Sequence, residues 1–139
     1  MLKSLAAEIF GIDVDPSQGG SSLADFEWRH RVVIIVSDDN HALASRQANL
    51  LLADEEGLKE RDIIVLEVGP NRVQTLFGPS YALNPYAIRY DLDISDPVFG
   101  LLLVGKDGSV KLRSDNVVMP FEIFALIDQM PMRQNEMRH

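Results

Sequence analysis

The fold is decided by the stretch Val98-Phe-Gly-Leu-Leu-Leu-Val-Gly-Lys-Asp-Gly-Ser-Val-Lys-Leu-Arg113. Its apolar first half predicts a buried strand over residues 98–104. Apolar and basic residues alternate over 110–113, which predicts an edge strand over 109–113 with one face in solvent. Gly105 and Gly108 favour a tight turn between the strands, because glycine adopts positive φ without strain. The stretch therefore predicts an antiparallel hairpin.

Prolines mark two helices around this hairpin. Pro85 begins a short helix through Asp91, since proline is tolerated in the first turn of a helix. Pro120 begins a second helix, over 120–130, whose apolar residues recur at helical spacing, and Pro131 is expected to end it. The expected apolar face consists of Phe121, Phe124, Ile127 and Met130.

The first half of the chain predicts a βαβ unit. Two β-branched runs, 32–36 and 62–68, are typical of strands buried on both faces of a parallel sheet. Between them, apolar residues recur at helical spacing over 41–58, which predicts one amphipathic crossover helix. Such a crossover is right-handed in nearly all proteins. We expect five core residues to be nearly fully buried: Ile34, Leu51, Val65, Leu102 and Phe124.

Two segments fall outside this pattern. Residues 1–27 pass into a run of small and polar residues at 13–22, which favours a partly flexible N-terminal arm before a domain over 28–139. Residues 71–84 contain Gly78-Pro79-Ser80 between two apolar runs, and both a small hairpin and an irregular loop fit this pattern. A long loop inside a compact domain is more often functional than not.

The resulting order, βαβ-α-ββα, is that of the thioredoxin-like fold, an α/β fold of three layers with a central mixed sheet. Four segments also resemble one bacterial family of unknown function. They are Trp28-Arg-His-Arg-Val-Val-Ile-Ile35, Leu58-Lys-Glu-Arg-Asp-Ile-Ile-Val65, Leu103-Val-Gly-Lys-Asp-Gly-Ser-Val-Lys111 and Ile127-Asp-Gln-Met-Pro-Met-Arg-Gln-Asn-Glu-Met137. Members of that family are similar to thioredoxin-like domains, remotely to peroxiredoxins, and to modules of vertebrate sushi-repeat extracellular matrix proteins. The resemblance implies a non-redox branch of the fold with no established activity.

Composition narrows the classes of function. The 139 residues suit one domain, and 13 basic against 21 acidic residues give a net charge of -8, which disfavours nucleic acid as a partner. The chain has no cysteine, so thiol oxidoreductase chemistry is excluded. No apolar run approaches the roughly 20 residues that span a bilayer. We expect a soluble protein without a leader, cytoplasmic as given, or periplasmic or secreted if a signal peptide has been removed.

The strongest candidate site is Ser37-Asp-Asp-Asn-His-Ala42, where strand 32–36 meets the following helix. Thioredoxin-like enzymes place their reactive group there, because first-turn N–H groups and the helix dipole stabilise an anion. The favoured role is helix capping by Asp39 or Asn40. The alternative makes Asp38, Asp39 and His41 ligands of a divalent cation, or His41 a general base.

Asp96 and Pro97 precede the third strand, where thioredoxin-like proteins commonly place a cis-proline. We therefore expect a cis Asp96-Pro97 bond, which either presents backbone to a peptide or forms an inherited turn. Carboxyl ends of strands meet at one crevice in open α/β sheets, so residues 38–41, the 71–84 segment and Asp96-Pro97 are expected to form one concave surface. Its acidity favours a cationic peptide or a metal ion over a phosphate.

Other motifs have simpler explanations. The Gly-Lys-Asp-Gly turn at 105–108 lacks the strand-to-helix context of a phosphate loop. Residues 28–31 favour cation–π stacking, with an acidic partner as the alternative. Met130 is expected in the core with the tail docked on its own domain, and the alternative is a partner surface that includes Met132 and Met137. No serine lies on a recognisable nucleophile elbow, so no Ser-His-Asp triad is expected.

These features predict a non-redox binding or interaction module for an unknown protein or a cationic peptide, with no catalytic residue, metal or cofactor expected. The surface residues expected to contact it are Asp38, Asp39, Asn40, His41, Asp96 and Pro97. The alternative is a non-thiol enzyme, metal-dependent in one form, centred on Asp38, Asp39 and His41.

Overall fold

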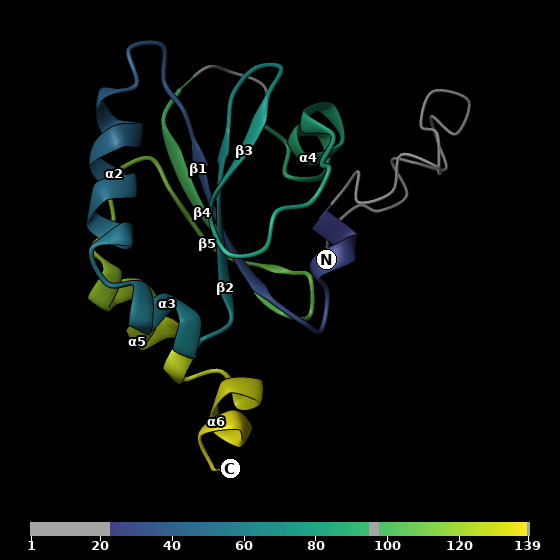
Figure 1. Ribbon diagram of the computed structural model, residues 1–139, viewed down its shortest axis with the longest axis vertical. Helices are drawn as coiled ribbons and strands as arrows, with labels where there is room; N and C mark the ends of the chain where they lie inside the picture. The colour runs from purple at the N-terminus through teal and green to yellow at the C-terminus, as the bar shows by residue number, and fades with distance from the viewer. Residues whose placement is uncertain (1–22, 95–97, 139) are drawn as a thin grey trace.

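The computed structural model describes residues 23–94 and 98–138 and shows a mixed sheet with helices on both faces (Figure 1). The elements are η2 (Leu23–Phe26), β1 (Arg31–Val36), α2 (Ala42–Leu52), α3 (Glu55–Glu60), β2 (Ile63–Val68), β3 (Val73–Phe77), α4 (Pro85–Asp91), β4 (Gly100–Val104), β5 (Val110–Ser114), α5 (Pro120–Asp128) and α6 (Pro131–Met137). The strand order is β3-β2-β1-β4-β5. Strands β1 and β2 are parallel, and every other neighbouring pair is antiparallel.

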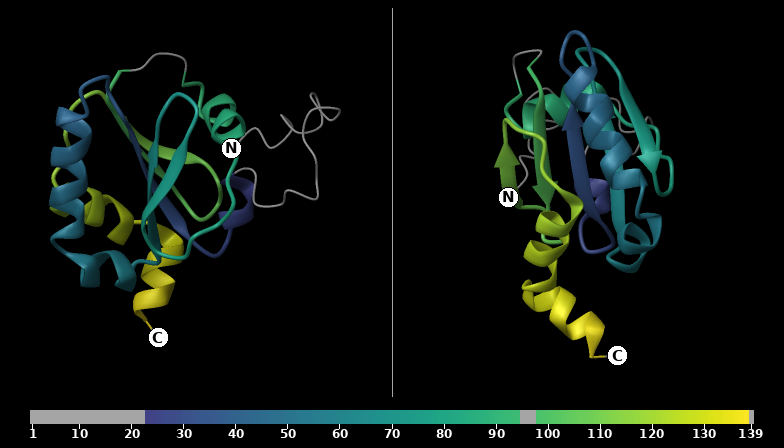
Figure 2. Two further views of the ribbon diagram at one scale, coloured as in Figure 1. Left: turned by 45° about the horizontal axis from the view of Figure 1, so that its top comes forward. Right: turned by 90° about the vertical axis from the view of Figure 1, so that its left-hand side faces the viewer.

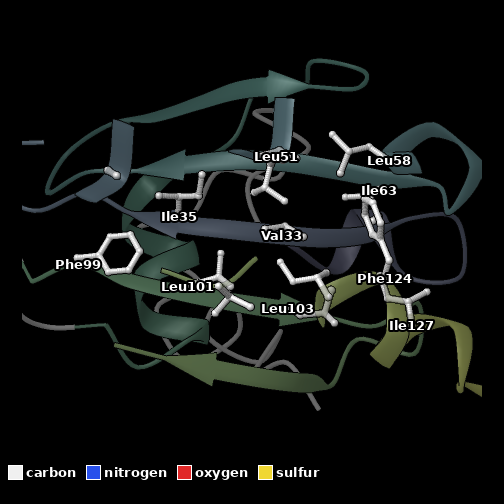
Figure 3. Close-up of a cluster of buried hydrophobic side chains, with 14 residues drawn as sticks. Val33, Ile35, Leu51, Leu58, Ile63, Phe99, Leu101, Leu103, Phe124 and Ile127 are labelled. Atoms are coloured by element: carbon white, nitrogen blue, oxygen red, sulfur yellow. The ribbon is translucent and has the colours of Figure 1, made fainter. Parts of the chain in front are cut away.

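Strand β1 is central because all of its side chains are apolar except the first, and all are buried. Val33 and Ile35 face the layer formed by α2, α3 and α5 (Figure 3), whereas Ile34 faces the layer formed by η2 and α4. Each fully buried aliphatic side chain of this kind contributes roughly 1.5–3 kcal/mol. The continuous β-branched run thus specifies a strand that is covered on both sides.

The five predicted core residues are confirmed, but Phe121, which was expected on the apolar face of the 120–130 helix, is 67% exposed. Ile34, Leu51 and Val65 are 0% exposed, Leu102 is 1% exposed and Phe124 is 9% exposed. The predicted βαβ unit, the short helix over 85–91 and the hairpin of β4 and β5 are also present. The sheet and its two helical layers therefore have the order that the sequence predicts.

The prediction of a single helix over 41–58 is wrong, because two helices, α2 and α3, occupy this segment. The break occurs at Asp54, whose carboxylate accepts a hydrogen bond from the backbone N–H of Gly57 and caps α3. Leu51 and Leu58 are both buried on the same side of the sheet. Their helical spacing continued across the break and concealed it.

Neither alternative for residues 71–84 holds in full. Residues 73–77 form β3, but β3 pairs with the preceding strand β2, across a turn in which Gly69 N donates to Arg72 O at 2.8 Å. Residues 78–84 contain no helix or strand. The 73–77 run therefore completes the edge of the main sheet.

Pro131 ends α5, as predicted, but it also begins a further short helix, α6. Proline fits this place because the first helical position needs no N–H donor. Met130 is half-buried against the core and Arg133 is buried, so the tail docks on its own domain as expected. The helix that follows Pro131 was not predicted.

Candidate functional site

A polar cleft of about 430 Å³ lies at the carboxyl ends of the parallel strands β1 and β2. Its volume falls within the roughly 300–1,000 Å³ typical of small-molecule sites. The β2–β3 turn at 69–72 forms one wall. Polar side chains that line it are those of Ser37, His41, Ser45, Glu67, Asn71, Arg72 and Gln74.

Ser37 forms the floor of this polar cleft where β1 ends. It is 5% exposed, and its backbone N–H donates to Val68 O at 3.0 Å. Its hydroxyl also donates to Val68 O, at the longer distance of 3.4 Å. The two parallel strands are therefore joined at the base of the cleft, which makes the floor rigid.

His41 is held at the rim by an unusual backbone conformation. It is the N-cap of α2, with φ 59° and ψ 9°, in the left-handed region that only a few per cent of non-glycine residues adopt. Such a conformation costs on the order of 1–3 kcal/mol and is common at binding sites. The imidazole is 64% exposed, and its Nδ1 lies 3.9 Å from Glu67 Oε2.

Glu67 provides the one carboxylate among the residues that line the cleft. It is the single charged residue of β2, and it pairs in register with Ile35 of β1 and Gln74 of β3. Its side chain is 26% exposed. On the opposite wall, Arg72 donates a 2.8 Å hydrogen bond to Gln74 Oε1. The cleft thus offers one carboxylate, one guanidinium that is bonded to Gln74, and neutral polar groups that include two hydroxyls.

The predicted site residues at 38–41 act mainly as helix caps. Asn40 Oδ1 accepts from Ala42 N at 3.0 Å, and Asp38 Oδ1 accepts from Ala44 N at 3.3 Å. Asn40 is therefore a cap as expected, while the second cap is Asp38 and not Asp39, which is exposed. Of this group, only His41 lines the polar cleft.

Asp96 and Pro97 lie outside the described residues, and so does the bond between them that was expected to be cis. Of the 71–84 segment, the part that lines the cleft is residues 71, 72 and 74. Within residues 23–94 and 98–138, no three His, Cys, Asp or Glu side chains are grouped closely enough to hold a metal ion. The triple of Asp38, Asp39 and His41 does not form such a group.

Sequence reasoning missed Glu67, Arg72 and Ser45. Glu67 carried a usable signal, because it is a lone charge in an otherwise apolar strand and lies next to its carboxyl end. Arg72 and Ser45 carried none, since a turn arginine and a helix serine are ordinary surface residues.

The Gly-Lys-Asp-Gly segment is a hairpin turn, as expected, closed by Gly108 N donating to Gly105 O at 2.9 Å. Lys106 is only 8% exposed, and its Nζ donates to Asp62 Oδ2 and Glu136 Oε2, each at 2.8 Å. Since both bonds go to protein carboxylates, this lysine is a structural residue.

The basic and aromatic residues at 28–31 differ in their exposure to solvent. Trp28 is 63% exposed, whereas Arg31 is 1% exposed and makes two hydrogen bonds to the carboxylate of Glu136, at 3.2 and 3.1 Å. The guanidinium of Arg31 therefore binds the C-terminal helix α6 to the start of β1. In the described part of the chain, no helix is long and apolar enough to cross a bilayer.

Comparison with solved structures supports the thioredoxin-like fold. The chain is similar to the reduced 2-Cys peroxiredoxin of Plasmodium vivax, with a TM-score of 0.51 and 13% identity over 84% of this chain and 85% of the peroxiredoxin. At this level of identity the likeness concerns the fold alone.

Sequence comparison identifies a relative and a family. The chain is 31% identical over 135 residues to the sushi repeat-containing protein SRPX of Homo sapiens. The aligned region covers 91% of this chain. It spans 28% of the length of that human protein. The model of one family matches residues 22–136. The chain therefore belongs to the family described as a domain of unknown function, DUF4174.

Proposed function

We propose that this protein is a non-redox binding module whose ligand occupies the polar cleft at the carboxyl ends of β1 and β2. The observation that supports this most is the position of the cleft, because open α/β sheets bind ligands outside the carboxyl ends of their strands. The chain lacks cysteine, so thiol exchange is not available at this place. Binding without redox chemistry is the function that remains best supported.

The ligand class that suits the cleft is a peptide segment with a lysine or arginine side chain. Glu67 is the one acid in the lining, and the net charge of -8 attracts cations over a longer range. A unit charge 4 Å from this carboxylate would gain roughly 4 kcal/mol before desolvation is subtracted. Arg72 is directed to Gln74, so its charge does not neutralise Glu67 through an ion pair.

The metal-dependent enzyme considered from the sequence has no comparable support. Asp38 and Asn40 already accept hydrogen bonds from the first turn of α2. Removing such a cap costs about 1 kcal/mol, so a metal at these side chains would bind at the expense of the helix. Binding of a cationic peptide leaves both caps in place.

The proposal is tested with an oriented library of octapeptides blocked at both ends. Enrichment of lysine or arginine at one position is expected, and Glu67→Gln should weaken binding of the selected peptide at least tenfold. Glu56→Gln is the matched control, since it removes the same charge from an exposed position of α3, which lies at the other end of β2 from its carboxyl end (Figure 1). A library without cationic enrichment, or equal losses in the two variants, would refute the proposal.

A further inference from the structure

The two edges of the sheet differ in how they are protected. Figure 2 shows β3 at one margin and β5 at the other. Edge β5 carries Lys111 and Arg113, whose side chains bond to Asp107 and to the carbonyl of Leu92. Charges of this kind discourage pairing with another chain. Edge β3 has the sequence Val-Gln-Thr-Leu-Phe and carries no charge and no proline.

The hydrogen bonding of the β2–β3 hairpin leaves part of the β3 backbone free. Gly69 N donates to Arg72 O, so these two residues form a hydrogen-bonded pair. Antiparallel ladders alternate, so the pairs of Val68 with Val73 and Leu66 with Thr75 direct their backbone groups outward. Within the described ranges, no other element bonds to the backbone of Val73 or Thr75. The N–H and C=O groups of these two residues are available to an added strand.

This free edge adjoins the polar cleft. Gln74, between the two outward-facing residues, lines the cleft and pairs in register with Glu67 on β2. A strand added beside β3 would lie two strand spacings from β2, about 10 Å. Lysine and arginine side chains are long enough to cross β3 from that position toward Glu67. The edge and the acidic group can therefore be used by one ligand.

We propose that β3 accepts an extended, cationic peptide as a sixth strand, with its backbone bonded to Val73 and Thr75 and one basic side chain directed to Glu67. This inference rests on the proposed function and specifies how the peptide is held. In strand addition, main-chain hydrogen bonds supply affinity and side-chain pockets supply specificity. Here the free edge of β3 would supply the main-chain hydrogen bonds, and the polar cleft would supply the side-chain pocket.

The test uses Thr75→Pro, with Thr75→Val as the matched control. Proline removes the outward N–H of residue 75 but none of the ladder bonds to β2, and proline is tolerated on edge strands. The probe is the blocked octapeptide selected from the library. Thr75→Pro should weaken binding at least tenfold, whereas Thr75→Val, which keeps the N–H, should bind as the unchanged protein does.

A second measurement keeps the test valid if Thr75→Pro does not fold. The selected peptide is methylated on alternate backbone nitrogens, in both registers, and is titrated into the unchanged protein. If methylation abolishes binding in one register and leaves it intact in the other, the result supports strand addition. Full binding in both registers, or by Thr75→Pro, overturns strand addition. If Glu67→Gln still weakens binding in that case, the proposed function stands; failure of every peptide to bind overturns both.

Discussion

Lys106, in the turn between β4 and β5, donates a 2.8 Å hydrogen bond to Glu136 of α6. Two of the segments that carry the family resemblance, 103–111 and 127–137, are thus in direct contact. Arg31, at the start of β1, bonds to the same carboxylate. In this chain, these contacts hold α6 against the start of β1, at the opposite end of that strand from the polar cleft.

Replacing Glu136 with glutamine should lower the free energy of unfolding by about 1–3 kcal/mol, the range for leaving buried donors poorly satisfied. Arg31 and Lys106 are 1% and 8% exposed, so neither can recover water once the carboxylate is neutralised. Chemical denaturation measures the change. Asp115→Asn at an exposed position is the control and should change stability by less than about 0.5 kcal/mol. Equal effects would show that the Glu136 contacts contribute nothing.

Stability should fall with acidification below about pH 4.5. Partial burial opposes ionisation of Glu136, but hydrogen bonds from Arg31 and Lys106 outweigh it and hold the pKa of its carboxyl below the ordinary 4.5. For Asp107, burial is likewise outweighed by bonds from Ser109 and Lys111, and the pKa falls from 3.8 to about 2.

Both pKa values are lower in the folded protein than in the unfolded chain. The unfolded chain therefore binds more protons in this range, and the stabilisation present above pH 4.5 is lost as the pH falls toward 2. Thermal midpoints between pH 6 and pH 2 measure this loss. The slope should be shallower in Glu136→Gln, and an identical slope would contradict the assignment of Glu136.

Gly57→Ala should destabilise the protein although alanine favours helices by about 1 kcal/mol. A Cβ at residue 57 would lie 2.6 Å from Phe124 Cε2 and 2.8 Å from Asp54 Oδ2. Overpacking of this kind costs about 1–3 kcal/mol and exceeds the helix gain. In a double-mutant cycle measured by denaturation, the cost should shrink in a Phe124→Leu background. A cost that is the same in both backgrounds would show that Phe124 is not the obstacle.

Phe124→Ala should cost about 3–5 kcal/mol, because it leaves a cavity where α5 covers the sheet. The ring is 9% exposed and also carries the guanidinium of Arg61 at 4.3 Å from its centroid. Exposed Phe121, three residues earlier on the same helix, is the control and should tolerate alanine with a much smaller loss. Comparable thermal midpoints for the two variants would contradict the packing described for α5.

The sequence predicted the sheet because the decisive signals were local. The apolar runs that became β1, β2 and β4 are buried on both faces, and Gly108 has the positive φ of 83° that its turn required. The break at Asp54 was missed because a cap interrupted a helix without interrupting its apolar spacing. The pairing of β3 was missed because edge strands need only a short, weakly patterned run.

The sequence directed attention to the carboxyl end of β1, where His41 lines the polar cleft and Asp38, Asp39 and Asn40 do not. The carboxyl end of β1 and the rim residue His41 follow from topology, which a βαβ pattern determines. The cleft lies on the β2 side of that end, and its acid, Glu67, comes from a strand whose register no local pattern determines. Asp38 and Asn40 appeared functional in the sequence because good helix caps and good ligands are the same residue types.

The most direct test of the binding site is a titration of the ¹⁵N-labelled protein with the selected blocked octapeptide, followed by backbone amide shifts. We expect the largest shifts at Ser37, His41 and Ser45, in the turn at 69–72, and along β3. Glu67→Gln should reduce these shifts at equal peptide concentration. Largest shifts at residues 28–31 or 130–137, with Ser37 and His41 unchanged, would contradict binding in the polar cleft and place the binding site elsewhere.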